Sequence, residues 1–258
     1  MYRMIFYDRL CLVFDRLFTK LSYLVRKIRV MNIHTPQNMI VFDLDGTLLD
    51  TWPSLLAAVM AFDPSGRALL KPFQLKRCLS DGIAPMLSLA LSQLQRDSDP
   101  NSSDFQQLLH SYEQHWLCTA KAFEGAEQLL QSLQQAGYRI GLCTNRDPRS
   151  TGVLLEHFGW EGMFDAKVHL GDCVTAKPSP EPLLKTLQLL GGSVEKSLFV
   201  GDSPVDALCA ARAKVAFAAH LAGYHTSRNE LEPCRVAFSH YHELARWLPS
   251  HHPVLMEV

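Results

Sequence analysis

Two aspartates, Asp43 and Asp45, directly follow the apolar run 39–42 and could bind a divalent metal ion beside a phosphate group. Because side chains alternate along an extended chain, both carboxylates point to the same side, and Gly46 lets the backbone turn sharply and approach a ligand closely. An EF-hand calcium loop does not fit, because the sixth position counted from Asp43 is Leu48 rather than glycine. A single aspartate here could be a helix cap, but a pair favours a metal site.

Further polar groups of related chemistry occur later in the chain. They are Thr144 with Asn145, Lys177, and Asp202 with Asp206, each just after or near an apolar run. Each alone has an ordinary structural explanation, as a turn hydroxyl, a solvated charge or acids at the start of a helix. Together they supply a hydroxyl, an ammonium group and a second carboxylate pair, which is a set suited to a phosphate and a divalent ion.

Short apolar runs alternate with helical segments from residue 39 onward, which is typical of an α/β domain with a largely parallel sheet. The predicted strands are 39–44, 139–143, 166–170, 197–200 and 215–221. The predicted helices are 126–136, 149–158, 180–190 and 205–213. Glycine directly follows the first three of these helices, as expected for a helix stop. Because the carboxyl ends of parallel strands meet at one edge, this fold would bring the polar groups together.

Residues 52–118 break this alternation, because they contain no convincing strand. Helical spacing of apolar residues extends over 84–96 and 103–118, and Pro53 is tolerated in a first helical turn. The segment starts soon after the first predicted strand and returns before the second. It would therefore lie above the carboxyl ends of the strands, where open parallel sheets bind ligands, and could act as a lid.

The composition is that of an ordinary globular chain with balanced charge. The 258 residues are 47% hydrophobic and 20% charged, with 25 Lys and Arg against 26 Asp and Glu. This balance argues against a nucleic-acid partner. Seven cysteines, an odd number without a Cys-x-x-Cys pair, argue against a disulfide framework and favour a reducing compartment. We therefore predict a cytoplasmic location.

The first thirty residues differ from the rest, because seven basic residues are interspersed with Leu, Phe and Tyr. The charges recur too often for a membrane span, and no signal-peptide order is present. Three interpretations stay open: a basic amphipathic helix on a membrane surface, a helix packed on the domain, and an upstream extension before a start at Met31. Membrane contact through residues 1–30 is the less favoured one, and the extension 1–37 keeps an uncertain status.

The chain resembles the haloacid dehalogenase superfamily of phosphohydrolases over residues 38–230. The four motifs of that family match, in the family's order, Asp43-x-Asp45-Gly46-Thr47, Thr144, Lys177, and Gly201-Asp202 with Asp206. Within the superfamily, the motifs are most similar to those of phosphoglycolate phosphatases. Among the departures from that pattern, Arg146 stands where lysine is usual, and Lys214 stands where glycine is expected after a helix. Neither removes a catalytic group.

The resemblance also implies a fold and a domain organisation. The fold would be α/β, a Rossmann-like parallel sheet with helices on both faces, plus a small all-helical cap inserted after the first strand. The core domain would comprise residues 38–52 and 119–230, and the cap residues 53–118. Residues 231–258 would form a C-terminal helix and tail packed on or near the core.

The chemistry of phosphate-ester hydrolysis gives each candidate a role. Asp43 would be the nucleophile and form an aspartyl phosphate, which splits hydrolysis into two displacements. Asp45 would protonate the leaving alkoxide and then take a proton from the attacking water. Thr144 and Lys177 would hold the phosphoryl oxygens, with Asn145 also contacting the substrate.

Magnesium is the predicted cofactor, because a carboxylate that attacks a phosphate ester needs charge neutralisation. The predicted ligands are Asp43, Asp202 and Asp45, the last through its backbone carbonyl. Asp206 would support the site by orienting Lys177.

These assignments predict a magnesium-dependent phosphomonoester hydrolase that acts on a small phosphorylated metabolite, with 2-phosphoglycolate implied by the resemblance. The alternative is a pyrophosphatase, a nucleotide phosphatase or a sugar-phosphate mutase of the same superfamily. A membrane-associated scaffold that uses the fold is the non-enzyme alternative, and the intact motifs weigh against it. Four basic residues stay open as contacts for a substrate carboxylate or as surface residues: Lys76, Arg77, Arg146 and Arg149.

Overall fold

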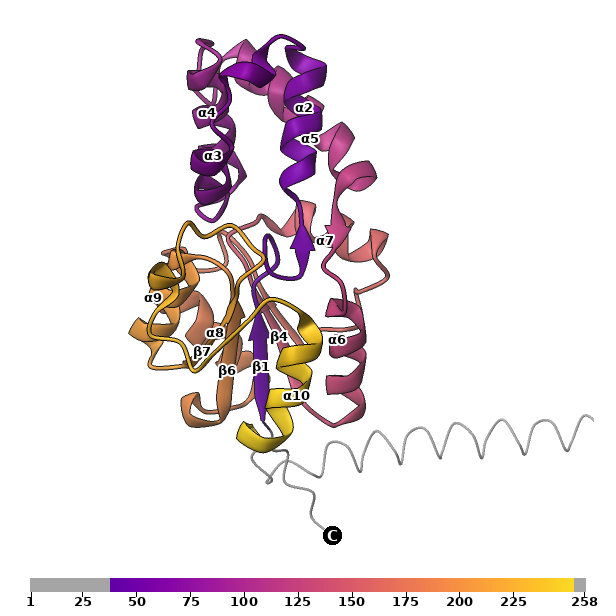
Figure 1. Cartoon of the computed structure of the whole chain (residues 1–258), viewed down its shortest axis with the longest axis vertical. Helices are drawn as coiled ribbons and strands as arrows, with labels where there is room; N and C mark the ends of the chain where they lie inside the picture. Colours follow the sequence, from indigo (N-terminus) through magenta and orange to yellow (C-terminus); the bar gives the residue numbers. More distant parts are fainter. Residues whose placement is uncertain (1–37, 253–258) are drawn as a thin grey trace, which may run out of the picture. The chain divides into compact units, whose positions relative to one another are not determined.

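The structure, a computed structural model, describes residues 38–252 and is built on a six-stranded parallel sheet. The strands are β1 (Met39–Phe42), β4 (Arg139–Cys143), β5 (Ala166–Val168), β6 (Ser197–Gly201), β7 (Ala216–His220) and β8 (Val236–Phe238). Their order is β5-β4-β1-β6-β7-β8, and Figure 1 labels the four central strands, β4, β1, β6 and β7. The sheet therefore extends from β1 in both directions, and the carboxyl end of β1 is the switch point where such sheets form ligand sites.

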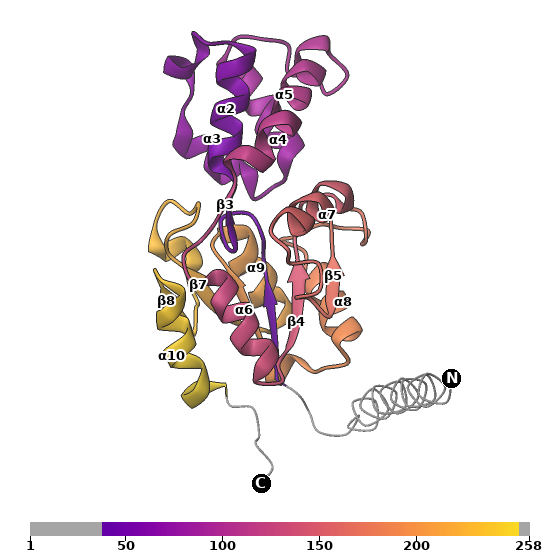
Figure 2. The same cartoon turned by 90° about the vertical axis from the view of Figure 1, so that its right-hand side faces the viewer.

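Helices cover both faces of this sheet (Figures 1 and 2). The buried side chains of β1 alternate between the faces, with Ile40 and Phe42 on one and Met39 and Val41 on the other. The first face is covered by α6 (Ala126–Gln135), α7 (Pro148–His157) and α10 (Tyr241–His251). The second face is covered by α8 (Glu181–Leu190) and α9 (Pro204–Ala213). The predicted α/β class, a parallel sheet between two layers of helices, is confirmed.

The predicted strands and helices of the core are all present, with ends shifted by at most two residues. Gly191 ends α8 in the left-handed region at a φ of 71°, as a glycine stop should. Lys214 ends α9 in the same region at a φ of 58°. Although residue 214 is lysine where glycine is expected, it adopts the left-handed backbone conformation that glycine favours.

Three short strands are absent from the sequence-based predictions. β2 (Leu49–Asp50) and β3 (Lys121–Ala122) form an antiparallel pair, and β8 adds a sixth strand beside β7. β2 and β3 have two residues each and β8 has three, so none shows a hydrophobic alternation long enough to recognise. The β2–β3 pair joins the chain where it leaves the core and where it returns.

Between β2 and β3 the chain forms a helical segment with its own hydrophobic cluster. Its helices are α2 (Trp52–Phe62), η1 (Gly66–Leu69), α3 (Pro72–Leu79), α4 (Ile83–Gln93) and α5 (Ser103–Thr119). Leu55, Leu87 and Leu108, from α2, α4 and α5, are fully buried in this cluster. The segment lies beyond the carboxyl end of β1 (Figures 1 and 2). The predicted domain bounds, including 53–118 for a cap, stay a prediction.

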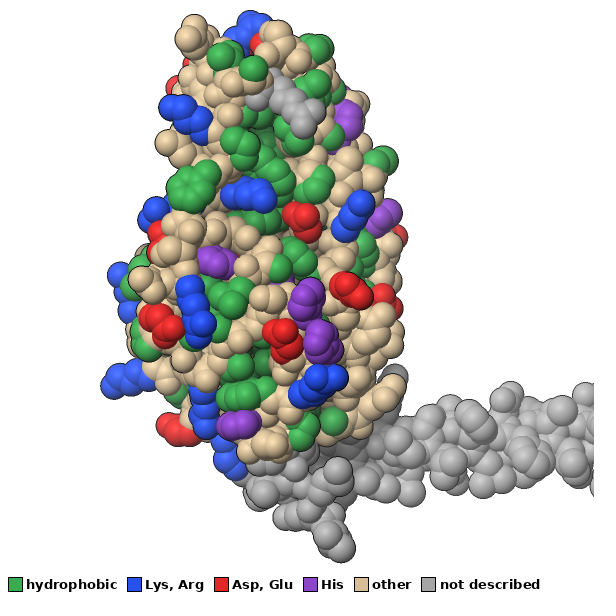
Figure 3. Space-filling model, in the orientation of Figure 1, with side chains coloured by type: hydrophobic (Ala, Val, Ile, Leu, Met, Phe, Trp, Pro, Cys, Tyr) green, Lys and Arg blue, Asp and Glu red, His purple; other side chains and the backbone are tan. Residues whose placement is uncertain are grey.

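No helix within residues 38–252 is long and apolar enough to cross a membrane. On the face shown in Figure 3, acidic and basic side chains are interspersed. The predictions for residues 1–37, including membrane contact through residues 1–30, lie outside the described residues. The predicted cytoplasmic location and the predicted lack of a nucleic-acid partner stay predictions.

His220 at the end of β7 is a titratable side chain buried in the core. Its Nδ1 lies 3.0 Å from the carbonyl oxygen of Gly46, so the neutral ring donates its proton there. The ring also packs edge-on against Phe123 at a centroid distance of 4.7 Å. Burial lowers the pKa of His220 from 6.5 to about 4.

We expect this histidine to make the protein less stable in acid. Below pH 6.5 the unfolded chain binds a proton on His220, whereas the folded chain stays neutral until about pH 4, so stability is lost as the pH falls through this window. The loss between pH 7 and pH 4.5 is roughly 2–3 kcal/mol for this group. Urea unfolding of the wild type and of His220→Gln at both pH values measures it. An equal acid-induced loss in both proteins would contradict the expectation.

Candidate active site

The residues proposed from the motifs converge at the carboxyl end of the sheet. Asp43 follows β1, Thr144 follows β4 and Asp202 follows β6. A pocket at this edge is lined by Asp43, Asp45, Thr144, Asn145, Arg146 and Lys177, and by Leu79, Ser80, Gly82 and Ile83 of the helical segment. The structure therefore brings side chains that are far apart in the sequence close together in space.

Lys177 bridges two buried aspartates. Its Nζ lies 2.7 Å from Oδ1 of Asp43 and 2.7 Å from Oδ1 of Asp206. Burial alone would lower the pKa of Lys177, but the charges of Asp206 and Asp43 raise it well above its usual value. The ammonium group is therefore charged and held between the two carboxylates by charge-assisted hydrogen bonds.

Asn145 fixes the backbone of Lys177. Its Oδ1 accepts a hydrogen bond from the Lys177 backbone nitrogen at 3.0 Å, and its Nδ2 donates to the Lys177 carbonyl oxygen at 2.9 Å. The same Nδ2 donates to the carbonyl oxygen of Ser80, at the end of α3, at 3.0 Å. Asn145 thus connects the Lys177 loop to the helical segment, and its predicted contact with substrate stays a prediction.

Asp43, Asp202 and Asp206 form a group that could hold a metal ion. All three are buried, and one carboxylate oxygen of each lies within 4.8 Å of the others. Burial, with Asp206 and Asp43, raises the pKa of Asp202 well above its usual value. Burial and Asp206 likewise raise the pKa of Asp43 to about 7, although Lys177 opposes this. Lys177 contacts only two of these three carboxylates, and a hard divalent cation such as Mg²⁺ fits this desolvated set of oxygen donors.

Two hydrogen bonds hold the Asp202 carboxylate, and two neighbouring glycines leave room for it. The Thr47 hydroxyl donates to its Oδ1 at 2.7 Å, and the backbone nitrogen of Tyr224 donates to its Oδ2 at 2.7 Å. A Cβ at Gly223 would lie 2.2 Å from the Cβ of Asp202, and a Cβ at Gly46 would lie 2.4 Å from its Oδ2. Only glycine leaves room for Asp202 at these two positions.

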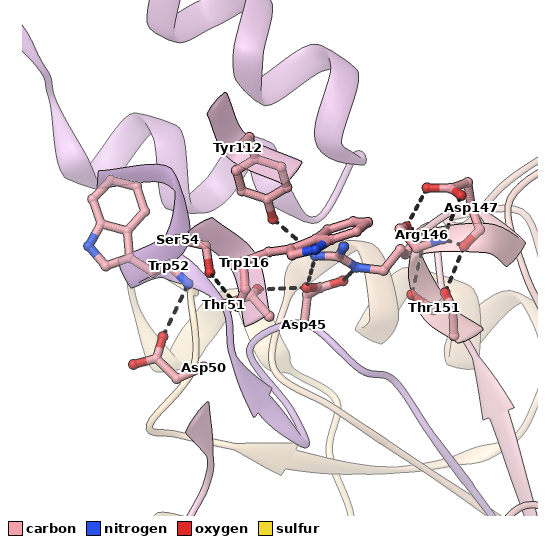
Figure 4. Close-up of polar contacts among 12 residues, drawn as sticks. Asp45, Asp50, Thr51, Trp52, Ser54, Tyr112, Trp116, Arg146, Asp147 and Thr151 are labelled. Carbon is pink, nitrogen blue, oxygen red and sulfur yellow. Dashed lines mark hydrogen bonds and ion pairs between the residues drawn. The ribbon is translucent and has the colours of Figure 1, made fainter. Parts of the chain in front are cut away.

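The carboxylate of Asp45 has a different set of partners (Figure 4). Arg146 donates from Nε to Oδ2 at 3.0 Å and from Nη2 to Oδ1 at 2.8 Å, and the Thr51 hydroxyl donates to Oδ1 at 2.6 Å. Burial alone would raise the pKa of Asp45, but the charge and hydrogen bonds of Arg146 and the Thr51 hydrogen bond lower it below its usual value. The Asp45 side chain is thus separate from the three clustered carboxylates.

The sequence and the fold of this chain are similar to those of known proteins. The family model for haloacid dehalogenase-like hydrolases matches residues 40–220. The chain belongs to the haloacid dehalogenase-like hydrolase family. This membership confirms the resemblance seen in the motifs, and the predicted enzyme class, a phosphatase, is confirmed with it.

This hydrolase is similar to known phosphoglycolate phosphatases. One from Cereibacter sphaeroides is 34% identical over 209 residues, which cover 80% of this chain and 94% of that protein. One from Xanthomonas campestris pv. campestris is 33% identical over 186 residues, which cover 72% of this chain and 83% of that protein. A solved structure of a predicted phosphoglycolate phosphatase from Haemophilus somnus has a TM-score of 0.71 at 21% identity and covers 83% of this chain and 99% of that one. The solved structure supports the same fold.

Of the four basic residues left open by the sequence, this hydrolase brings only Arg146 into the pocket that Asp43 and Lys177 line. Its one sequence signal is its place directly after Thr144 and Asn145, where the family pattern usually has lysine. The other three contact groups outside that pocket: Lys76 lies over the rings of Trp52 and Tyr224, Arg77 lies 3.5 Å from Glu230, and Arg149 lies 3.8 Å from Glu113.

Tyr224 is a further residue of this hydrolase that sequence reasoning missed. Its hydroxyl accepts hydrogen bonds from the backbone nitrogens of Thr51 at 2.7 Å and Trp52 at 2.9 Å, and donates to Asp50 at 2.9 Å. It therefore satisfies the first amides of α2 from a loop more than 170 residues away. No local motif marks a residue that caps a helix across such a separation.

A larger cavity adjoins the pocket that Asp43 and Lys177 line. It has a volume of about 260 Å³, against about 10 Å³ for the smaller pocket, and Ile83 and Asn145 line both. Its other walls include the apolar side chains of Phe105, Leu109 and Trp116. Ser80, Gly82 and Ile83, from the turn between α3 and α4 and the start of α4, form part of the wall of the smaller pocket.

Proposed function

We propose that this hydrolase is a Mg²⁺-dependent phosphatase that cleaves a phosphomonoester through an aspartyl phosphate on Asp43, with 2-phosphoglycolate as its substrate. The observation that carries the mechanism is the buried carboxylate of Asp43, clustered with Asp202 and Asp206 and contacted by Lys177 at 2.7 Å. The relatives at 34% and 33% identity, which are named phosphoglycolate phosphatases, support the substrate.

In the first proposed step, the Asp43 carboxylate attacks phosphorus. A bond forms between Asp43 and phosphorus while the ester bond to the leaving oxygen breaks. Asp45 in its protonated form gives its proton to that oxygen, so the alcohol departs neutral. The products are the phosphorylated Asp43 and the alcohol, which for 2-phosphoglycolate is glycolate.

In the second proposed step, water attacks the phosphorus of phosphorylated Asp43. The Asp45 carboxylate takes a proton from this water as the new bond to phosphorus forms and the bond to Asp43 breaks. Inorganic phosphate leaves and the Asp43 carboxylate is restored. Asp45 ends the step protonated, ready to serve as the acid of the next turnover.

The remaining site residues position and neutralise the phosphoryl group. Lys177 and the Thr144 hydroxyl would hold its oxygens through both steps, which is the main contribution a protein makes to phosphoryl transfer. Asp206 orients Lys177 through the 2.7 Å contact. Asp43, Asp202 and the Asp45 backbone carbonyl would hold Mg²⁺, which when bound neutralises the phosphate and polarises its phosphorus for attack.

A panel of phosphorylated metabolites tests this function. We expect phosphate release from 2-phosphoglycolate with kcat/KM at least about tenfold above those for pyrophosphate, nucleotides and sugar phosphates. Removal of Mg²⁺ with EDTA should lower the rate roughly 10³-fold, and added Mg²⁺ should restore it. A preference for pyrophosphate or a nucleotide would overturn the substrate, and metal-independent turnover would overturn the mechanism.

A further inference from the structure

Arg146 links the acid–base carboxylate Asp45 to the helical segment. Its guanidinium donates from Nε and Nη2 to the two oxygens of Asp45, at 3.0 and 2.8 Å. The same Nη2 donates to the hydroxyl of Tyr112, on α5, at 3.0 Å. Figure 4 shows the three side chains meeting at this point, with Arg146 between the other two.

The link lies in a desolvated environment. The Arg146 side chain is 1% exposed and that of Asp45 is 10% exposed. Trp116, one turn after Tyr112 on α5, lies against the guanidinium at 5.7 Å from its ring centroid. A bidentate arginine contact in such a place fixes the direction of a carboxylate as well as its charge. A lysine, which the family pattern usually has here, presents a single point of charge and cannot reproduce both bonds.

The hydrogen-bond donors around Asp45 indicate in which step of the proposed reaction this arrangement acts. Arg146 and the Thr51 hydroxyl together supply three donors to the two oxygens of Asp45. Three donors fix the direction of the ionised carboxylate, and the ionised form is the one that can take a proton. In the proposed mechanism Asp45 accepts a proton in the second step, when water attacks the phosphorylated Asp43.

We propose that Arg146 is a positioning residue for the second step, and that Tyr112 completes its placement, so that α5 contributes to hydrolysis of the phosphorylated enzyme. This inference rests on the proposed function. Arg146 reaches Asp45 from the loop after β4, whereas Tyr112 belongs to the helical segment. The base therefore takes its productive direction only when α5 is docked against the core.

Four variants test the inference in rapid-quench turnover with Mg²⁺. The substrates are p-nitrophenyl phosphate and 2-phosphoglycolate, and the phosphorylated enzyme is measured by intact-protein mass. Arg146→Gln removes the bidentate contact, Arg146→Lys keeps the charge, and Tyr112→Phe removes only the hydroxyl on α5. Arg96→Gln is the matched control, because Arg96, like Arg146, lies over an aromatic ring, that of Phe62 at 5.9 Å, but is exposed and lines neither pocket.

For Arg146→Gln we expect kcat to fall about 10²-fold, by the same factor on both substrates, while phosphorylated enzyme accumulates. Tyr112→Phe should show the same pattern with a fall of roughly three- to tenfold. Arg146→Lys should recover part of the loss, and Arg96→Gln should behave as wild type. If Arg146→Gln fails to fold, the accumulation of phosphorylated enzyme in Tyr112→Phe decides.

Two results would overturn the inference: kcat that does not fall, or kcat that falls without accumulation of phosphorylated enzyme. A loss confined to 2-phosphoglycolate would overturn it as well, because only the leaving-group step depends on the alcohol. Failure of the proposed function would look different. The wild type would then show no Mg²⁺-dependent turnover of either substrate, or Asp43→Asn would still become phosphorylated.

Discussion

Replacing Asp43 with asparagine is expected to lower kcat roughly 10⁴-fold or more and to prevent formation of phosphorylated enzyme. The amide oxygen of asparagine is a poor nucleophile and carries no charge, so the first step has no acceptor for the phosphoryl group. The change is almost isosteric, and Lys177 keeps its 2.7 Å contact with Asp206, so the fold should persist. Phosphate release and intact-protein mass after quenching measure the two effects.

Asp165→Asn is the matched control for this experiment. Asp165 directly precedes β5, at the edge of the sheet opposite the site, where its carboxylate accepts a hydrogen bond from the Ile140 backbone nitrogen at 3.0 Å. An asparagine oxygen can accept the same bond, so activity should stay near that of the wild type. Substantial turnover by Asp43→Asn, with a phosphoryl group on the protein, would place the nucleophile elsewhere.

Replacing Lys177 with methionine is expected to cause the largest loss of stability of any single change at the site. The ammonium group contacts Asp43 and Asp206, whose side chains are 9% and 0% exposed. Its removal leaves two buried carboxylates facing each other without the cation between them, which costs about 3–5 kcal/mol. Urea unfolding in EDTA measures this loss without compensation from a bound divalent cation.

Two comparisons make the Lys177 result specific. Lys121→Met replaces an exposed lysine on β3 and should change the free energy of unfolding by less than about 0.5 kcal/mol. Adding Asp206→Asn to Lys177→Met should recover part of the loss, because one of the two unpaired carboxylates becomes neutral. If the double variant is no more stable than Lys177→Met, the repulsion between the buried carboxylates is not the cause.

The sequence determined the elements of the core because their signals are local. Each long strand is a short apolar run, and the predicted helices end at recognisable stops such as Gly191. The convergence of the proposed site residues was predictable for a related reason. In a parallel sheet the carboxyl ends of the strands share one edge, so Asp43, Thr144 and Asp202 had to meet once their strands were placed.

Tertiary structure alone decided what each of these groups touches. An arginine in a loop is ordinarily exposed, so nothing local could show that Arg146 is buried against Asp45, 101 residues earlier, and against Tyr112 on α5. The support of α2 by Tyr224 depends on a similar long-range contact. Spacing along the chain reports which side chains share an edge or a face. Their hydrogen-bond partners are set by how separate elements pack, which no local pattern encodes.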